Sequence, residues 1–284
     1  MAIKAGIILF SLVLGALAIP TPESDDLFKF FQNVYPDSRI VGGSAAAEGA
    51  HPHMVAMTSG TILRSFSCGG SIIARRSVLT AAHCISAHYS FGSVSSSVRL
   101  TVGTNAWNSG GESFGVSGNA THPNYVSTLI KNDLGILYTS SAITYTPRIQ
   151  PITLSFDFIG AGINARAAGW GRISANGALS ARLLEVVLPT IDGQQCVTEA
   201  IQAGITHSMS QPGVQPHIEL CTRHPNGPGI GTCRGDSGSA LVNVNDGRQI
   251  GIVSWGFPCA LAGAPDMFVR VSAFQSWLNA NIRD

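Results

Sequence analysis

Charged residues are scarce in this sequence. Asp, Glu, Lys and Arg make up 12% of 284 residues, about half the share found in an average soluble protein. The formal net charge is only +1 at pH 7, so the chain lacks the charge excess that attracts nucleic acids or anionic membranes. We therefore expect neither nucleic acid nor a membrane as a partner. The 45% of hydrophobic residues and the 32 glycines favour a compact β protein with many turns, and they exclude a disordered chain.

Lysine is nearly absent. The chain has three lysines, Lys4, Lys29 and Lys131, against 14 arginines. Because lysine loses its charge near about pH 10.4 and arginine only beyond about pH 12, this bias favours work in a strongly alkaline fluid such as a gut lumen. Drift in composition and protection from lysine-directed proteolysis are the alternatives.

Long apolar runs are also missing, except at the N-terminus. There Lys4 precedes AGIILFSLVLGALA, which ends in the small-residue pattern Ala16-Leu17-Ala18. A charged start, a short apolar run and an A-x-A site predict a signal peptide over residues 1–18. The run is shorter than the roughly 20 residues that span a bilayer, which disfavours a membrane anchor. We expect a secreted, extracellular protein.

The six cysteines lack the paired C-x-x-C spacing of zinc sites. Since an exported protein enters an oxidising compartment, an even number of cysteines predicts disulfides. The six are Cys68, Cys84, Cys196, Cys221, Cys233 and Cys259. Their spacing alone leaves all pairings open.

Short apolar segments alternate with turn residues from Ile40 onward, which predicts an all-β fold of the sandwich or barrel type. The last segment differs, because Phe274, Trp277, Leu278 and Ile282 fall on one face of a helix that Ser272 would cap. A second, weaker helix is expected after Asp192, near Cys196.

The stretch GTCRGDSGSALV, residues 231–242, places Ser237 between glycines just before a strand. A serine nucleophile needs a base, and the base needs a carboxylate to orient it. His83 ends the apolar stretch LTAAHC, and Asp133 precedes the apolar strand in NDLGIL. These two are the candidates for base and acid. Five other histidines stand beside proline or in polar surroundings and are expected at the surface: His51, His53, His122, His207 and His224.

The motifs IVGG, TAAHC, NDLGIL, GWG, GDSG and SWG follow one another in this order. From Ile40 to the C-terminal helix the chain resembles the chymotrypsin-like serine proteases, and in its pocket pattern the insect chymotrypsin-like and crab collagenolytic digestive enzymes. The resemblance implies two antiparallel six-stranded β-barrels with the active site between them. The first barrel would span about 40–150, the second about 151–270, and a C-terminal helix about 273–283. It implies no cofactor and no metal.

The resemblance also assigns roles. Ser237 would be the nucleophile, His83 the general base and Asp133 the residue that orients it. The N–H groups of Gly235 and Ser237 would form the oxyanion hole. Ser254, Trp255 and Gly256 would pair with the substrate backbone. The implied disulfides join Cys68 to Cys84, Cys196 to Cys221, and Cys233 to Cys259.

Activation of a zymogen is implied as well. Residues 19–39 would be a propeptide, removed by a trypsin-like protease that cuts between Arg39 and Ile40. The new Ile40 ammonium would then pair with Asp236. The expected partners are protein or peptide substrates, this activating protease, and protein protease inhibitors.

The specificity pocket departs from the common family pattern. Its floor falls at Gly231 and its walls at Gly256 and Asp266, a position usually held by glycine. An inward carboxylate predicts cleavage after large apolar or aromatic residues with some tolerance of Arg or Lys. A carboxylate that points to a solvated edge would leave plain chymotrypsin-like specificity.

The sequence therefore predicts a secreted digestive serine endopeptidase, residues 40–284. One alternative is a non-catalytic homologue that acts as a binding or adaptor protein, which is disfavoured because all three triad residues are present. The other is a cascade protease, which is disfavoured because the short segment before Ile40 cannot hold a regulatory module.

Overall fold

The computed structural model describes residues 43–173, 177–224, 230–257, 259, 261 and 263–284. The predicted signal peptide and propeptide, with Arg39 and Ile40, lie outside the described residues. Within the described part, no helix is long and apolar enough to cross a membrane.

Six antiparallel strands close the first barrel in the order β2-β3-β4-β9-β8-β7. Its strands are β2 (Met54–Ser59), β3 (Ser65–Ala74), β4 (Ser77–Thr80), β7 (Arg99–Val102), β8 (Glu112–Thr121) and β9 (Gly135–Thr139). The short helix α2 (Ala82–Ser86) follows β4, and a small hairpin of β5 (Tyr89–Ser90) and β6 (Ser93–Val94) comes after it.

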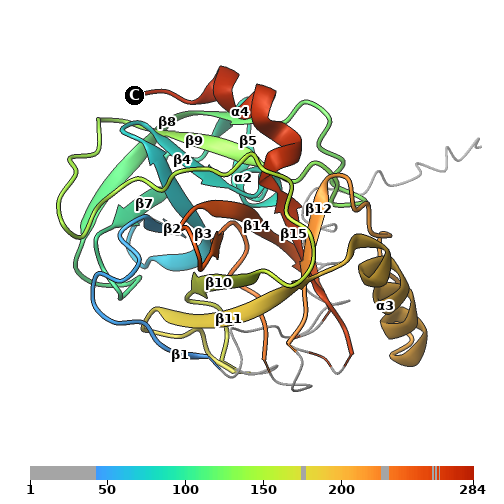
Figure 1. Cartoon of the computed structure of the whole chain (residues 1–284). Coiled ribbons are helices and arrows are strands. Elements are labelled where there is room, and N and C mark those ends of the chain that lie inside the picture. The colour runs from blue at the N-terminus through green and yellow to red at the C-terminus, as the bar shows by residue number, and fades with distance from the viewer. Residues whose placement is uncertain (1–42, 174–176, 225–229, 258, 260, 262) are drawn as a thin grey trace, which may run out of the picture.

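The second barrel runs in the order β11-β10-β13-β14-β15-β12, and pairing between β11 and β12 closes it. Its strands are β10 (Asn164–Gly169), β11 (Leu184–Ile191), β12 (Glu219–Thr222), β13 (Ala240–Asn243), β14 (Gln249–Gly256) and β15 (Asp266–Arg270). β1 (Ser44–Ala45) adds to β11, so the described chain begins at the second barrel (Figure 1). The predicted pair of six-stranded antiparallel barrels is confirmed.

Apolar side chains fill both barrels, because successive residues of a strand point to opposite faces of the sheet. Leu100 and Ile136 are fully buried in the first barrel, and Leu188 and Phe268 in the second. Trp170 is fully buried beyond the end of β10 and donates its indole N–H to the carbonyl of Asn105, 2.8 Å away. This bond joins a second-barrel residue to the segment that follows β7.

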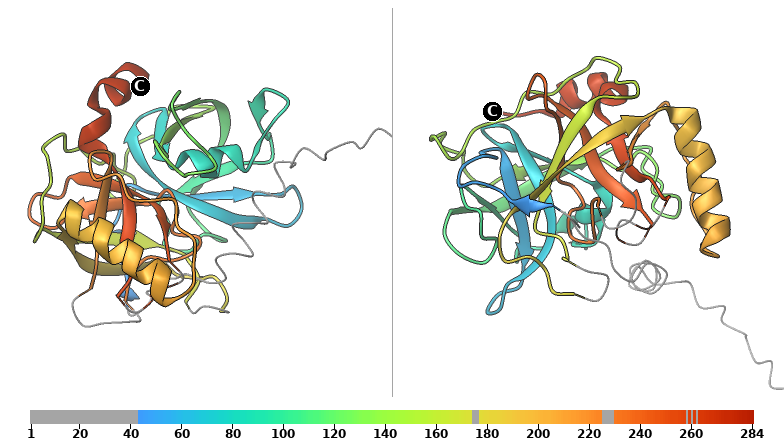
Figure 2. Two further views of the ribbon diagram at one scale, coloured as in Figure 1. Left: turned by 90° about the vertical axis from the view of Figure 1, so that its right-hand side faces the viewer. Right: turned by 60° about the horizontal axis from the view of Figure 1, so that its bottom comes forward.

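The predicted helix after Asp192 is confirmed. The Asp192 side chain accepts the N–H groups of Gln194 and Gln195 at 2.8 and 3.1 Å, which caps the first turn of α3 (Gly193–Thr206). The disulfide Cys196–Cys221 ties this helix to β12. Figure 2 shows α3 on the outside of the second barrel.

The C-terminal helix begins later than the sequence suggested. Ser272 lies inside a 3-10 turn, η1 (Val271–Phe274), and the residue before α4 (Gln275–Asn281) is Phe274. The prediction that Ser272 caps the helix was therefore wrong, because the chain leaves β15 through a tighter turn first. Phe274 and Leu278 are buried as expected. The Tyr138 hydroxyl donates to the carbonyl of Asn281 at 2.9 Å, so the segment after the second barrel packs on the first.

Candidate active site

His83 lies where a strand of the first barrel gives way to a helix. β4 ends at Thr80, and the fully buried residues Ala81 and Ala82 lead into α2. The small alanines allow the backbone to turn tightly, and the disulfide Cys68–Cys84 ties α2 to β3. The imidazole keeps 29% of its surface exposed, so one edge of the ring is accessible.

Asp133 lies just before β9 with 1% of its side chain exposed. Its Oδ1 accepts the backbone N–H of His83 at 2.8 Å. Its Oδ2 accepts His83 Nδ1 and the Ser254 hydroxyl, each at 2.7 Å. Burial alone raises the pKa of this carboxyl, but the charge and hydrogen bonds of His83 and the Ser254 bond outweigh burial, and the pKa is lowered.

The carboxylate in turn sets the state of the imidazole. Burial favours neutral His83, but the Asp133 charge and hydrogen bond outweigh it, so the pKa of His83 is raised above 6.5. Since an ionised carboxylate can only accept, Nδ1 carries the proton that it donates to Asp133. In the neutral ring the proton-accepting nitrogen is then Nε2.

The loop that carries Ser237 is attached to the same strands. The N–H of Gly69 on β3 donates to the carbonyl of Ser237 at 2.8 Å. Gly238 has a φ of +83°, and a Cβ there would lie 2.2 Å from Thr80 Oγ1 and 2.5 Å from the Gly69 carbonyl oxygen. Only glycine permits this approach. The loop before β13 therefore packs on the end of β4, next to His83.

Asp236 is fully buried. Its two carboxylate oxygens accept the N–H groups of Gly171 and Cys233, at 2.9 and 2.8 Å. A Cβ at Gly169 or Gly171 would collide with this carboxylate. Gly235 precedes it with a φ of +99°. The predicted oxyanion-hole residue thus has a backbone conformation that favours glycine.

The three residues predicted to form the specificity pocket also lie together. Asp266 and Gly256 are directly paired on β15 and β14. Asp266 Oδ2 accepts the N–H of Thr232, the neighbour of Gly231, at 2.8 Å. Burial raises the pKa of the Asp266 carboxyl to about 7, while the Thr232 hydrogen bond acts to lower it. The carboxyl therefore points toward the segment that contains Gly231 and Thr232. A small cavity beside it is lined by Thr222, Ile230, Leu261, Gly263 and Ala264, among others.

Two of the three implied disulfides are confirmed, Cys68–Cys84 and Cys196–Cys221. In the third implied pair, the sulfurs of Cys233 and Cys259 lie 2.9 Å apart, compared with the roughly 2.05 Å of a disulfide. Within the described residues, one group of potential metal ligands lies close together: Cys68, His83 and Cys84. Both of its sulfurs belong to a disulfide, so the group offers no thiolate to a metal.

The expectation of surface positions for His51 and His53 was wrong. Their exposed fractions are 9% and 7%. His51 Nε2 bonds the Glu185 carboxylate at 2.5 Å. Burial, helped by the nearby His51, lowers the pKa of His53 to about 3. Pro52, between them, indicated a surface loop, but this loop lies against β11, where Glu185 bonds His51.

A comparison with protein families finds the trypsin model matching residues 40–278. The chain belongs to the trypsin family. It is a serine endopeptidase, and the match covers both barrels and every residue of the site described above. Three relatives illustrate the similarity.

The chain is 34% identical to trypsin alpha-4 of Lucilia cuprina over 85% of its own length and 87% of the relative. It is 35% identical to chymotrypsin-2 of Vespa crabro, over 85% of its own length and 99% of the relative. It is 34% identical to alkaline trypsin B of Manduca sexta, over 86% of its own length and 91% of the relative. These names include both trypsins and a chymotrypsin, so the residue preference of this trypsin-family member has to be argued from its own pocket.

Ser254 has a side-chain role that was not predicted from the sequence. The prediction placed it only on the segment that pairs with the substrate backbone, whereas its hydroxyl donates to Asp133. A weak signal exists, because Ser254 is the polar residue in the otherwise apolar run IGIVSW. The buried ion pair between Lys131 and Glu219 was missed too, and no local pattern indicates it.

Proposed function

We propose that this trypsin-family chain is a secreted digestive endopeptidase, made as a zymogen, that cleaves proteins after large apolar or aromatic residues and tolerates Arg or Lys. The observation that carries the proposal is the hydrogen-bonded pair His83–Asp133 next to the Ser237 loop. A serine nucleophile requires an accessible imidazole whose Nε2 can accept a proton. A buried, ionised carboxylate holds the imidazole in that state.

The catalytic steps follow from this geometry and the family's known roles. Ser237 Oγ attacks the peptide carbonyl carbon as its proton passes to His83 Nε2. The N–H groups of Gly235 and Ser237 stabilise the oxyanion, and losing one such donor costs about 100- to 1000-fold in rate. The imidazolium, stabilised by Asp133, then protonates the leaving amine. Water attacks the acyl-enzyme by the same route and releases the acid.

The pocket supports the proposed specificity. Gly231 at the floor contributes no side chain, which leaves depth for Phe, Tyr, Leu or Met. Asp266 lies beside that floor through its bond to Thr232. Because its pKa is about 7, the carboxyl is neutral in weakly acidic solution and charged in alkaline solution. Arg or Lys would then be accepted best at high pH.

The β14 segment Ser254–Gly256 supports binding of an extended peptide. β15 pairs with one side of this segment. On the other side, β13 pairs with β14 only as far as Ile252. Among the described strands, that edge is left for a substrate strand to add by main-chain hydrogen bonds.

Zymogen activation would free the amino group of Ile40, which lies outside the described residues. It is supported by the burial of Asp236, which suits a carboxylate that receives a new ammonium group after cleavage at Arg39. Removing one partner of a buried pair costs about 3–5 kcal/mol, enough to disturb the neighbouring oxyanion loop. We further propose that Cys233 and Cys259, whose sulfurs lie 2.9 Å apart, form the third disulfide by exchange with another disulfide, which accepts their two electrons and two protons and becomes two thiols.

The test is turnover of peptides that differ at the residue before the scissile bond, with full-length protein before and after trypsin treatment. Ser237→Ala is the catalytic control, and Arg39→Gln blocks the activating cut. We expect turnover after Phe, Tyr and Leu, weaker turnover after Arg, and none in either variant. Turnover by Ser237→Ala would refute the assigned nucleophile. Equal turnover before and after trypsin treatment would refute the zymogen. A purified, folded chain that cleaves nothing after treatment would favour the adaptor role.

A further inference from the structure

Lys131 is the single lysine after residue 39, and it is buried. Its side chain is 3% exposed, and its Nζ donates to Glu219 Oε1 at 2.6 Å. The Nζ also lies 4.6 Å from the centre of the Trp255 ring, within the range of a cation–π contact. Burying two charges has a desolvation cost that their attraction repays only with good geometry and further hydrogen bonds.

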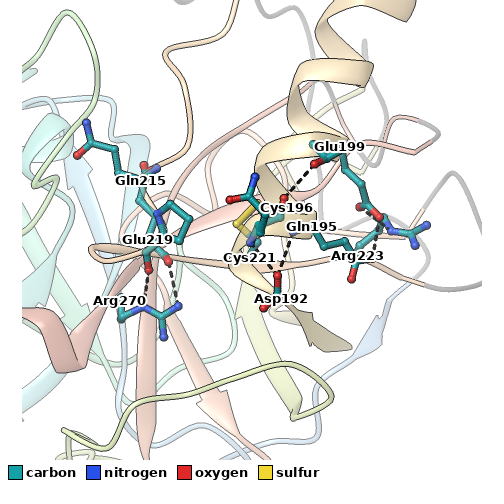
Figure 3. Close-up of a disulfide and its surroundings, with 12 residues drawn as sticks. Asp192, Gln195, Cys196, Glu199, Gln215, Glu219, Cys221, Arg223 and Arg270 are labelled. Carbon is teal, nitrogen blue, oxygen red and sulfur yellow. Dashed lines mark hydrogen bonds and ion pairs between the residues drawn. A yellow bond between two sulfur atoms is a disulfide. The ribbon is translucent and has the colours of Figure 1, made fainter.

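Those further bonds are present around Glu219. Oε1 also accepts the Trp255 indole N–H at 2.7 Å, and Oε2 accepts the backbone N–H of Gln215 at 2.5 Å. Arg270 fixes the backbone of Glu219 by donating to its carbonyl at 3.1 Å. Figure 3 shows Gln215, Glu219 and Arg270 close together. The carboxylate is therefore held by hydrogen bonds from three segments of the chain, and Arg270 holds its backbone from a fourth.

These contacts close a ring that includes the proposed active site. Lys131 stands two residues before Asp133, and Trp255 directly follows Ser254. Ser254 donates to Asp133 at 2.7 Å, while Lys131 and Trp255 meet at Glu219. The segment before Asp133 and the segment proposed to bind substrate are thus joined twice.

The backbone around Lys131 needs such an anchor. Ile130 and Asn132, its two neighbours, have φ values of +48° and +53°. Residues other than glycine rarely adopt this left-handed region, least of all a β-branched residue such as Ile130. Strained conformations of this kind persist where surrounding contacts over-determine them. The buried Lys131 side chain supplies such a contact between the two strained residues.

We propose that Lys131 and Glu219 are positioning residues that fix Trp255, and with it the substrate-binding edge of β14, against the Asp133 segment. The inference rests on the proposed function, in which Ser254–Gly256 pairs with the substrate backbone. Losing the ion pair would then weaken binding of extended peptides and leave the chemistry at Ser237 largely intact.

The test variant is Glu219→Gln. A glutamine amide has one accepting oxygen, whereas the carboxylate has two. The amide nitrogen must therefore face either the Gln215 N–H or the Trp255 and Lys131 donors. The Lys131 charge also loses its partner. The matched control is Glu199→Gln. Glu199 lies on α3 and pairs with Arg223 at 2.8 Å (Figure 3). The control therefore removes the same charge from an ion pair outside the ring of contacts that includes Asp133. Lys131→Met serves as the second variant, since it removes the cation and keeps an unbranched side chain.

Each trypsin-activated variant is assayed on two substrates with the same residue before the scissile bond, a single-residue ester and a tetrapeptide amide. Rates are normalised to active sites by titration. We expect KM for the tetrapeptide to rise about tenfold in Glu219→Gln and Lys131→Met, as misplaced binding groups do, while kcat/KM for the ester changes less than about twofold. Glu199→Gln should match the parent on both.

A merely structural role would lower the active fraction or the melting temperature and leave the tetrapeptide KM unchanged in the molecules that remain active. That result overturns the positioning role, and so does an equal loss on both substrates. An inactive parent protein would refute the proposed function instead.

Discussion

Asp266 offers the sharpest prediction about specificity. Its carboxyl accepts the Thr232 N–H at 2.8 Å and lies across the strand pair from Gly256. Asp266→Asn keeps the size of the side chain and an oxygen for Thr232, so the pocket keeps its shape and loses only its charge. We expect cleavage after Arg to fall and cleavage after Leu to persist.

The size of the effect follows from the pKa of about 7. A carboxyl with this pKa is about 10% ionised at pH 6 and about 90% at pH 8. The ratio of kcat/KM for an Arg substrate to that for a Leu substrate should therefore rise about ninefold between these pH values. At pH 8 the variant should lose about 10- to 100-fold on the Arg substrate, which corresponds to the ~1.5–3 kcal/mol of a hydrogen bond to a charged group.

The assay uses two tetrapeptide amides that differ only in Arg or Leu before the scissile bond. Titration of His83 affects both substrates equally, so it cancels in the ratio and leaves the titration of Asp266. The reasoning is refuted if the parent's ratio does not change between pH 6 and 8. It is also refuted if Asp266→Asn shows the same pH dependence as the parent.

Three further predictions concern the proposed triad and its loop. Asp133→Asn should lower kcat about 10⁴-fold, the loss known for this change in the same family; a loss below about tenfold in active-site-titrated protein would contradict the assigned role. Gly238→Ala should abolish turnover because its Cβ would meet Thr80 Oγ1, whereas Gly247→Ala, with a φ of +70° and open space around it, should stay active; an active Gly238→Ala would remove the steric argument. The pKa of His83 is raised, and only the neutral imidazole accepts a proton. The value of kcat/KM on a Leu substrate should therefore fall with decreasing pH around a midpoint above 6.5. A midpoint below 6.5 would count against Asp133 as the ionised partner of His83.

Residues whose chemistry depends on their immediate neighbours could be found in the sequence. Ser237 is recognisable by the glycines near it, Gly235 and Gly238, and by the apolar strand that follows. The capping carboxylate of Asp192 also acts within its own turn, which is why α3 was predicted correctly. The short apolar segments predicted a sandwich or a barrel, and the family resemblance carried by the motif order implied the pair of barrels.

Features that depend on strand register could not be read in this way. The pairing of Asp266 with Gly256 depends on a bulge in β14 between Val253 and Trp255, and no local sequence pattern reveals such a shift of register. Lys131 and Glu219 are 88 residues apart in the sequence, and only closure of the second barrel beside the Asp133 segment brings them together. The burial of His51 and His53 likewise depends on how the barrels pack.

Covalent labelling tests the central claim most directly. The trypsin-activated protein is treated with a fluorophosphonate, which phosphonylates an activated serine, and the adduct is located by peptide mass spectrometry. The proposed mechanism predicts one adduct, on Ser237, formed in step with loss of activity and absent from a His83→Ala variant. Loss of activity with the adduct on a different serine, or full labelling of Ser237 without His83, would contradict it.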